Sequence, residues 1–174
     1  MRYLLLLCFC FSPIFLMAQS SGRSHRVVNN NTTAPFKQYP IIPAFPLTLP
    51  DGTVITKNDL KKNVPTIVFV FSVDCDHCKH LTEDLLKNID KFKKTQILMI
   101  TPFQAEQMKE YYNQYKIKDY SNIIMASEPT RQIMYFYDMK YFPGIFIYNK
   151  KQQLIKNYEG TVKLDQMLEA IKQG

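Results

Sequence analysis

The sequence predicts an α/β fold, with a central sheet of mixed strand direction covered by helices on both faces. The first observation behind this prediction is segment 65–72, which is continuously apolar and rich in β-branched and aromatic residues, as strands buried on both faces are. The second is the alternation of strand-like and helix-like segments that follows it. The third is the end of the chain, where a hairpin and a helix close the pattern. The 174 residues are enough for one such domain with its own core.

A short hairpin and a helical turn precede the buried strand. Residues 45–49 and 53–55 are expected as two strands around the turn Pro50-Asp51-Gly52, and Thr56 or Asn58 can cap a helical turn after them. The later elements follow from the same alternation: helices are expected at 77–92, 102–115, 129–137 and 161–172, and strands at 96–101, 122–126, 144–149 and 153–158.

Residues 1–19 are predicted to be a signal peptide. They carry one charge, Arg2, ahead of an apolar run from Leu4 to Met17, which is short for a bilayer span and suits the core of a signal peptide. Ala18 supplies a small residue beside the expected cleavage point. Cleavage implies an exported protein of the periplasm or cell envelope; the alternative is an uncleaved segment that anchors the chain to a membrane.

Residues 20–40 are predicted to be a flexible tether. Their first part is rich in Ser, Asn and Thr and poor in apolar side chains, and prolines punctuate the entry to the domain. The folded domain is therefore expected over residues 41–174.

The charge pattern indicates a solvated, mildly basic surface. The formal net charge is +7, and the lysines are spread along the chain between acidic residues. The sequence contains no tight basic cluster with stacking aromatic residues, so nucleic acid is not expected as a partner. A membrane is expected as a partner only if the N-terminal segment stays uncleaved.

Two of the four cysteines remain once the signal peptide is removed. Cys8 and Cys10 leave with it, and Cys75 and Cys78 form a single C-x-x-C motif. In an oxidising compartment a structural disulfide usually closes a long loop, because that constrains the unfolded chain most. A bridge across two residues gains little in this way, so the spacing favours a catalytic pair.

The position of the motif gives the two cysteines different roles. Cys75 falls where the buried strand ends and a helix begins, and free N–H groups and the helix dipole at that point lower the pKa of a thiol. Cys78 is one turn further on and shares a helix face with Leu81 and Leu85. We expect Cys75 to be the exposed nucleophile and Cys78 the buried resolving thiol of a redox-active Cys75–Cys78 disulfide.

The two residues between the cysteines tune the pair in opposite directions. A protonated His77 would stabilise the Cys75 thiolate, whereas a negative Asp76 would raise the pKa of that thiol. Because the signs conflict, the residues alone leave the direction of electron flow open.

A metal centre is the alternative use of these side chains. Cys75, His77, Cys78 and His80 offer up to four ligands of the kinds that bind zinc or copper. Four ligands crowded at one helix start cannot easily all face one ion, and the remaining histidine, His25, lies in the tether. No cofactor is therefore expected, and a copper- or zinc-handling module is the second hypothesis.

Pro143 is the other candidate site residue. It stands directly before the strand expected at 144–149, where a proline is either an ordinary strand entry or a cis-proline. The sequence alone favours the trans form.

Over its folded part the chain resembles the thioredoxin superfamily, and more closely the exported TlpA/ResA-like branch of thiol–disulfide oxidoreductases and redoxins. The likeness rests on the motif F-x-L-x-L-P-D-G beginning at Phe45, on the apolar strand before Cys75-Asp-His-Cys78, and on Pro143 before the hairpin. An added strand and helix within 101–141 match an insertion typical of this branch. The resemblance implies a thioredoxin-like fold with a cis Pro143 facing the cysteines. It also implies disulfide exchange with protein substrates, preferably as a reductase, and a redox partner that supplies or accepts electrons.

The chain also departs from the family pattern. Asp74 stands where thioredoxins have Trp, and Phe69 replaces the buried acid that they carry six residues before the nucleophile. Ser72, three residues before Cys75, echoes the peroxiredoxin motif, but Val68 stands where that motif has proline. A thiol peroxidase is therefore a minor alternative.

Overall fold

The computed structural model describes residues 33–174, so the predicted signal peptide and most of the predicted tether lie outside the described residues. The helices are α1 (Pro35–Gln38), α2 (Asp76–Lys87), α3 (Ala105–Gln114), α4 (Gln132–Tyr137) and α5 (Leu164–Gln173). The strands are β1 (Leu47–Thr48), β2 (Val54–Ile55), β3 (Thr66–Val70), β4 (Gln96–Thr101), β5 (Ile123–Ser127), β6 (Gly144–Tyr148) and β7 (Leu154–Glu159). Short 3-10 turns lie at Lys57–Asp59, Ile89–Phe92 and Ile117–Asp119. None of the helices in this part of the chain is long and apolar enough to cross a membrane.

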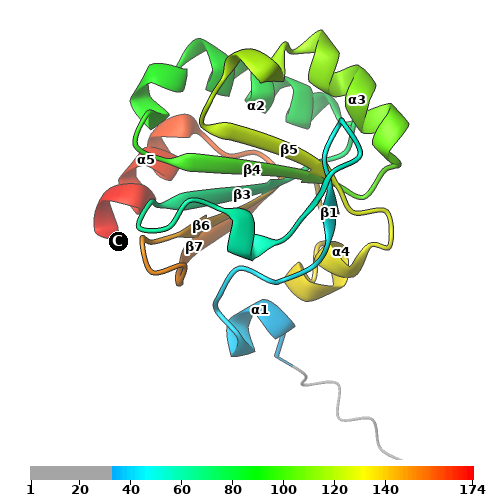
Figure 1. Cartoon of the computed structure of the whole chain (residues 1–174). Coiled ribbons are helices and arrows are strands. Elements are labelled where there is room, and N and C mark those ends of the chain that lie inside the picture. The colour runs from blue at the N-terminus through cyan, green and yellow to red at the C-terminus, as the bar shows by residue number, and fades with distance from the viewer. Residues whose placement is uncertain (1–32) are drawn as a thin grey trace, which may run out of the picture. The chain divides into compact units, whose positions relative to one another are not determined.

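The strands form one mixed sheet in the order β2-β1-β5-β4-β3-β6-β7. β3, β4 and β5 run parallel, β6 runs antiparallel to β3, and β7 runs antiparallel to β6. Helices α2, α3 and α5 cover one face, and α1 and α4 cover the other (Figure 1). The predicted α/β fold, with its mixed sheet, N-terminal hairpin and strand–helix insertion, is confirmed.

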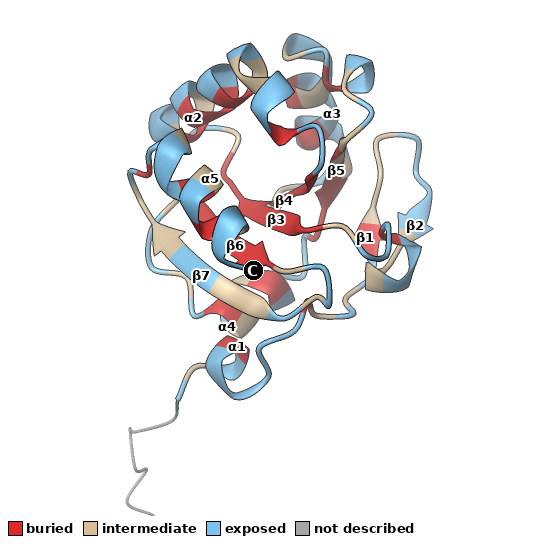
Figure 2. Ribbon diagram, turned by 90° about the vertical axis from the view of Figure 1, so that its left-hand side faces the viewer, coloured by how far each residue is buried: buried red, intermediate tan, exposed pale blue. Residues whose placement is uncertain are grey.

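The burial of β3 explains its continuously apolar sequence. The strand lies between β4 and β6, and its side chains alternate between two cores. Ile67 and Phe69 pack in the core under α2, α3 and α5, whereas Val68 and Val70 pack in the core under α1 and α4. These four side chains are 0% exposed (Figure 2). A strand with two dry faces has no place for polar residues, so the run cannot alternate.

The helix after the cysteine motif is shorter than the sequence predicted. It ends at Lys87, and a 3-10 turn at Ile89–Phe92 takes the place of its last turn. Asn88 causes the break: its backbone N–H bonds back to Asp84 and Leu85, and its side-chain amide donates to the Asp84 carbonyl at 2.9 Å. An asparagine that bonds the backbone in this way competes with the regular helical ladder.

The last part of the predicted flexible tether is instead folded onto the domain. Residues Pro35–Gln38 form α1, and Phe36 is buried against Tyr137 and Phe146. The buried ring of Phe36 holds this segment on the domain, although the segment before it is mainly polar. The packed domain therefore begins ahead of residue 41.

Two buried tyrosines make the stability of this fold sensitive to alkaline pH. The hydroxyl oxygens of Tyr137 and Tyr148 lie 2.8 Å apart in a hydrogen bond, and burial raises the pKa of both phenols above the ordinary 10.0. The unfolded chain loses these protons near pH 10, whereas the folded chain holds them. The free energy of unfolding should therefore be independent of these groups below pH 10.0 and fall as the pH rises above it.

Urea unfolding at pH values on both sides of 10.0 measures this effect. The double variant Y137F/Y148F removes both hydroxyls together, so it should fold at neutral pH and lose stability less steeply in alkali. An equally steep decline in the double variant would show that other groups cause the effect.

Candidate active site

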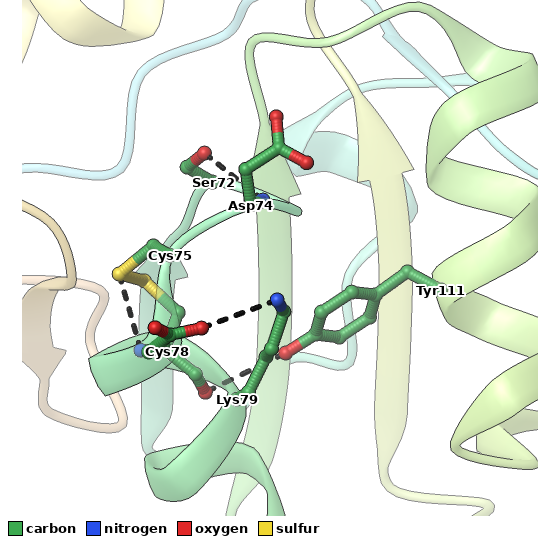
Figure 3. Close-up of polar contacts among 7 residues, drawn as sticks. Ser72, Asp74, Cys75, Cys78, Lys79 and Tyr111 are labelled. Atoms are coloured by element: carbon green, nitrogen blue, oxygen red, sulfur yellow. Dashed lines mark hydrogen bonds and ion pairs between the residues drawn. A yellow bond between two sulfur atoms is a disulfide. The ribbon is translucent and has the colours of Figure 1, made fainter.

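A tight turn after β3 places the cysteine motif at the start of α2. The backbone N–H of Asp74 donates to the Ser72 hydroxyl at 3.3 Å, and the N–H of Cys75 donates to the Ser72 carbonyl, also at 3.3 Å (Figure 3). Cys75 has an extended backbone and is the N-cap residue of α2. Ser72 therefore shapes the turn that aims Cys75 at the helix N-terminus.

Cys75 and Cys78 are joined by a disulfide, with their Cα atoms 5.2 Å apart. The sulfur of Cys75 accepts a hydrogen bond of 3.1 Å from the backbone N–H of Cys78 (Figure 3). In the reduced protein the same N–H and the positive end of the α2 dipole face the Cys75 sulfur, and both stabilise a thiolate there.

The two cysteines differ in exposure as their spacing predicted. Cys78 is 0% exposed and belongs to the core with Leu81 and Leu85, whereas Cys75 is half-buried at the surface. An incoming disulfide can thus approach the Cys75 sulfur, while protein atoms surround the Cys78 sulfur.

Asp76 and His77 are both exposed beside the disulfide. The Asp76 carboxylate forms an ion pair with the Lys79 ammonium at 3.3 Å, three residues along the helix (Figure 3). This pairing partly neutralises the charge that would oppose a Cys75 thiolate. Sequence reasoning missed Lys79, although the spacing of three residues on one helix could have revealed it.

A buried tyrosine of the neighbouring helix α3, on the same face of the sheet, supports the active-site helix. The Tyr111 hydroxyl of α3 lies 3.5 Å from the Cys78 carbonyl oxygen (Figure 3). It also donates to the Thr82 hydroxyl at 2.9 Å. Its ring packs on Phe71, with the centroids 4.8 Å apart, and burial raises the pKa of its phenol. The contact joins positions about thirty residues apart, which no local motif indicates.

Because β3 and β6 pair antiparallel, the start of β6, which follows Pro143, lies beside the end of β3, which precedes the cysteine motif. Val70 at the end of β3 pairs with Gly144 at the start of β6. Pro143 therefore precedes β6 where the turn to Cys75 follows β3. The Phe142–Pro143 peptide bond is cis, as the family resemblance implied, and Pro143 is buried.

Glu159, at the end of β7, holds the loop that leads into Pro143. Its carboxylate oxygen Oε2 accepts hydrogen bonds from the backbone N–H groups of Lys140 at 2.9 Å and Tyr141 at 3.0 Å. The next residue, Gly160, donates its N–H to the Pro143 carbonyl at 2.8 Å. Sequence reasoning missed Glu159, because its partners lie 18 and 19 residues away.

Removing this carboxylate should affect protein substrates more than small thiols. We expect Glu159→Ala to loosen the loop before Pro143 and raise the KM for a protein disulfide by roughly three- to tenfold. The equilibrium with small thiol buffers, which need no loop contact, should not change. Glu169→Ala, which removes an exposed carboxylate from α5, is the control. If the two variants change the KM equally, Glu159 has no specific part in substrate binding.

The residues of the alternative metal centre do not assemble into one. In residues 33–174, no group of three or more His, Cys, Asp or Glu side chains is placed to hold a metal ion. His77 and His80 are exposed, and both cysteine sulfurs are joined in the disulfide.

Solved structures similar to this chain share its fold. One is the exposed lipoprotein thioredoxin Etrx1 of Streptococcus pneumoniae, at 19% identity over 75% of this chain and 99% of that chain, with a TM-score of 0.60. Another is a secreted disulfide oxidoreductase of Mycobacterium tuberculosis, at 13% identity over 75% and 96% of the two chains, with a TM-score of 0.62. A third is ScoI of Arabidopsis thaliana with copper bound, at 19% identity over 77% and 99%, with a TM-score of 0.60.

Sequence comparison gives the family. Among curated protein sequences no significant match is found. The family model described as AhpC/TSA family matches residues 40–157, a span that holds both cysteines, Pro143 and most of the sheet. The chain therefore belongs to the AhpC/TSA family, and its fold is that of the thioredoxin-like proteins.

Proposed function

We propose that this protein is an exported thiol–disulfide oxidoreductase that reduces disulfides in protein substrates. The observation that carries the proposal is the Cys75–Cys78 disulfide at the N-terminus of α2, with Cys75 half-buried and Cys78 fully buried. A nucleophilic thiol and a resolving thiol need this asymmetry.

The exchange proceeds in two displacements. The Cys75 thiolate of the reduced protein attacks one sulfur of a substrate disulfide, a mixed disulfide forms, and the other substrate sulfur leaves as a thiolate. Cys78 then gives up its proton and attacks the Cys75 sulfur, which releases the second substrate thiolate and forms the Cys75–Cys78 disulfide. The substrate gains two electrons and two protons, and a dithiol redox partner restores the reduced protein.

Pro143, itself buried, is proposed to shape the groove in which the substrate backbone lies, together with the loop before it. Two observations support this role: the start of β6 lies beside the end of β3, and the loop donates two hydrogen bonds to Glu159. Reduction is the proposed direction because the motif and insertion resemble the TlpA/ResA-like branch. Asp76 and His77, both exposed beside the disulfide, are proposed to tune its potential.

Export is supported by the N-terminal sequence and by the fold neighbours. An apolar core of signal-peptide length follows Arg2. The similar structures include an exposed lipoprotein and a secreted disulfide oxidoreductase. We accordingly place the protein in the periplasm or cell envelope.

A peroxidase function has less support. The Ser72 hydroxyl, which echoes the peroxiredoxin motif, accepts a hydrogen bond from the Asp74 amide and serves the turn before α2. Val68 is a buried residue of β3 where that motif has proline.

Alkylation of the reduced protein tests the roles of the two cysteines. We expect iodoacetamide to modify Cys75 at least about tenfold faster than Cys78, because Cys75 is accessible and its thiolate is stabilised by the α2 N-terminus. Peptide mass spectrometry distinguishes the two sites, and unfolding in urea should make their rates similar. Equal rates in the folded protein would contradict the assignment of nucleophile and resolving thiol.

A further inference from the structure

A second site lies at the end of the sheet opposite the disulfide. It is a cavity of about 590 Å³ where β3 and β4 begin, closed on one side by the last turns of α5. The whole length of β3 separates it from Cys75, which for five extended residues is roughly 16 Å. The cavity is therefore not part of the substrate surface around the cysteines.

Positive charge converges on this cavity from four separate segments. Its lining includes six lysines and no acidic residue: Lys61, Lys91, Lys93, Lys94, Lys150 and Lys172. Lys61 precedes β3, three of the others lie just before β4, Lys150 is in the turn between β6 and β7, and Lys172 is at the end of α5. Three of them are already close in the sequence, at positions 91–94, and the fold brings the other three from separate segments.

Most of these charges have no acidic partner in the fold. Within residues 33–174 the ion pairs are Lys79–Asp76, Lys93–Asp90 and Lys140–Asp138, and only Lys93 of these lysines lines the cavity. Lys61 makes one long contact, 3.5 Å from its ammonium to the Ser121 carbonyl oxygen. Unpaired like charges around a concave, low-dielectric wall repel one another and attract anions.

The Asn122 and Gln96 side chains on the floor of the cavity already form hydrogen bonds within the protein. The Asn122 amide donates to the carbonyls of Phe92 and Thr95, and Gln96 binds the Lys61 backbone N–H and the Thr66 hydroxyl. Leu168 and Ile171 of α5 add an apolar wall. Because the Asn122 and Gln96 amides serve the fold, the lysine ammonium groups are the charged donors that face a ligand.

We propose that this cavity binds a ligand carrying two or more phosphate groups. Its volume lies in the range of small-molecule sites, and lysines are compact point charges suited to phosphate oxygens. The ligand is either a soluble polyphosphorylated compound or the headgroup of a phospholipid that carries two phosphates, such as cardiolipin, because both present this chemistry.

The test uses the oxidised protein, with sodium tripolyphosphate as the soluble probe. We expect saturable binding that perturbs the amide NMR signals of Asn63, Thr95, Asn122 and Lys172, leaves those of Cys75 and Cys78 unchanged, and weakens as salt rises. The variant K94Q/K172Q removes one charge from each of two walls and should weaken binding at least about tenfold. The control K109Q/K118Q loses the same charge from lysines outside the cavity and should change the affinity less than about twofold.

Vesicles distinguish the two sources of phosphate. Sedimentation with cardiolipin vesicles but not with phosphatidylcholine vesicles, lost in K94Q/K172Q and kept in K109Q/K118Q, would assign a lipid headgroup. Binding of tripolyphosphate alone would assign a soluble ligand. Equal affinities of the two variants, or no binding of either probe at the cavity, would overturn the proposal.

Discussion

Cys78→Ala is expected to turn a transient intermediate into a stable covalent complex between this protein and its substrates. The variant keeps the half-buried Cys75 sulfur at the N-terminus of α2, so attack on a substrate disulfide can still occur. It lacks the thiol that lies in the core one turn away, so the mixed disulfide cannot be resolved from within the protein. Turnover should fall to the background level while bound substrates accumulate.

The measurement is recovery of the variant from an extract of the organism's envelope under non-reducing conditions, followed by release of bound proteins with a reductant. Cys75→Ala and the double variant Cys75→Ala/Cys78→Ala are the controls, and neither should trap a partner because the nucleophile is absent. A Cys78→Ala variant that traps nothing, or traps as much as the double variant, would count against exchange with protein substrates.

Tyr111→Ala is expected to be the most destabilising single change near the site. Tyr111 is 3% exposed, packs in tilted contacts against Phe71 and Tyr115, and donates a hydrogen bond to the Thr82 hydroxyl of the active-site helix. Removing a buried aromatic ring leaves a cavity and costs about 3–5 kcal/mol in the free energy of unfolding. Loss of the ring also removes the hydrogen bond from α3 to Thr82 of α2, so the rate of disulfide exchange should fall with stability.

Urea unfolding of the oxidised protein measures the effect. Tyr111→Phe keeps the ring and loses only the hydroxyl, so it should cost about 1 kcal/mol. Tyr135→Ala removes the same side chain from a position that is 77% exposed and should stay within about 0.5 kcal/mol of the parent. A Tyr111→Ala variant as stable as Tyr135→Ala would show that α3 does not support the active-site helix.

The parts of the fold and site that the sequence predicted depend on local patterns. The apolar run of β3 predicted a strand that is buried on both faces. The spacing of Cys78, Leu81 and Leu85 predicted that all three lie on one helix face, and this face packs in the core. The position of Cys75 at the N-terminus of α2 was predicted from the same helix start. Each of these predictions uses residues within a few positions of one another, where helix and strand periodicity apply directly.

The parts that it did not predict depend on contacts between distant segments. Glu159 and Tyr111 act on residues 18 or more positions away, and the lysines of the second site come from four segments that only the sheet order brings together. The lysines looked evenly dispersed along the chain, although they gather at one end of the fold. Burial of Phe36 was hidden for a related reason, because one ring in a polar segment leaves no periodic signal.

The equilibrium reduction potential of the Cys75–Cys78 pair, titrated against thiol buffers, tests the central claim most directly. We predict a reversible two-electron couple near the thioredoxin value of about −270 mV, as a reductase supplied by a dedicated partner requires. A reversible couple near about −120 mV would contradict the reducing direction and indicate an enzyme that introduces disulfides. Failure to form any reversible intramolecular disulfide would contradict thiol–disulfide exchange as the function of this site.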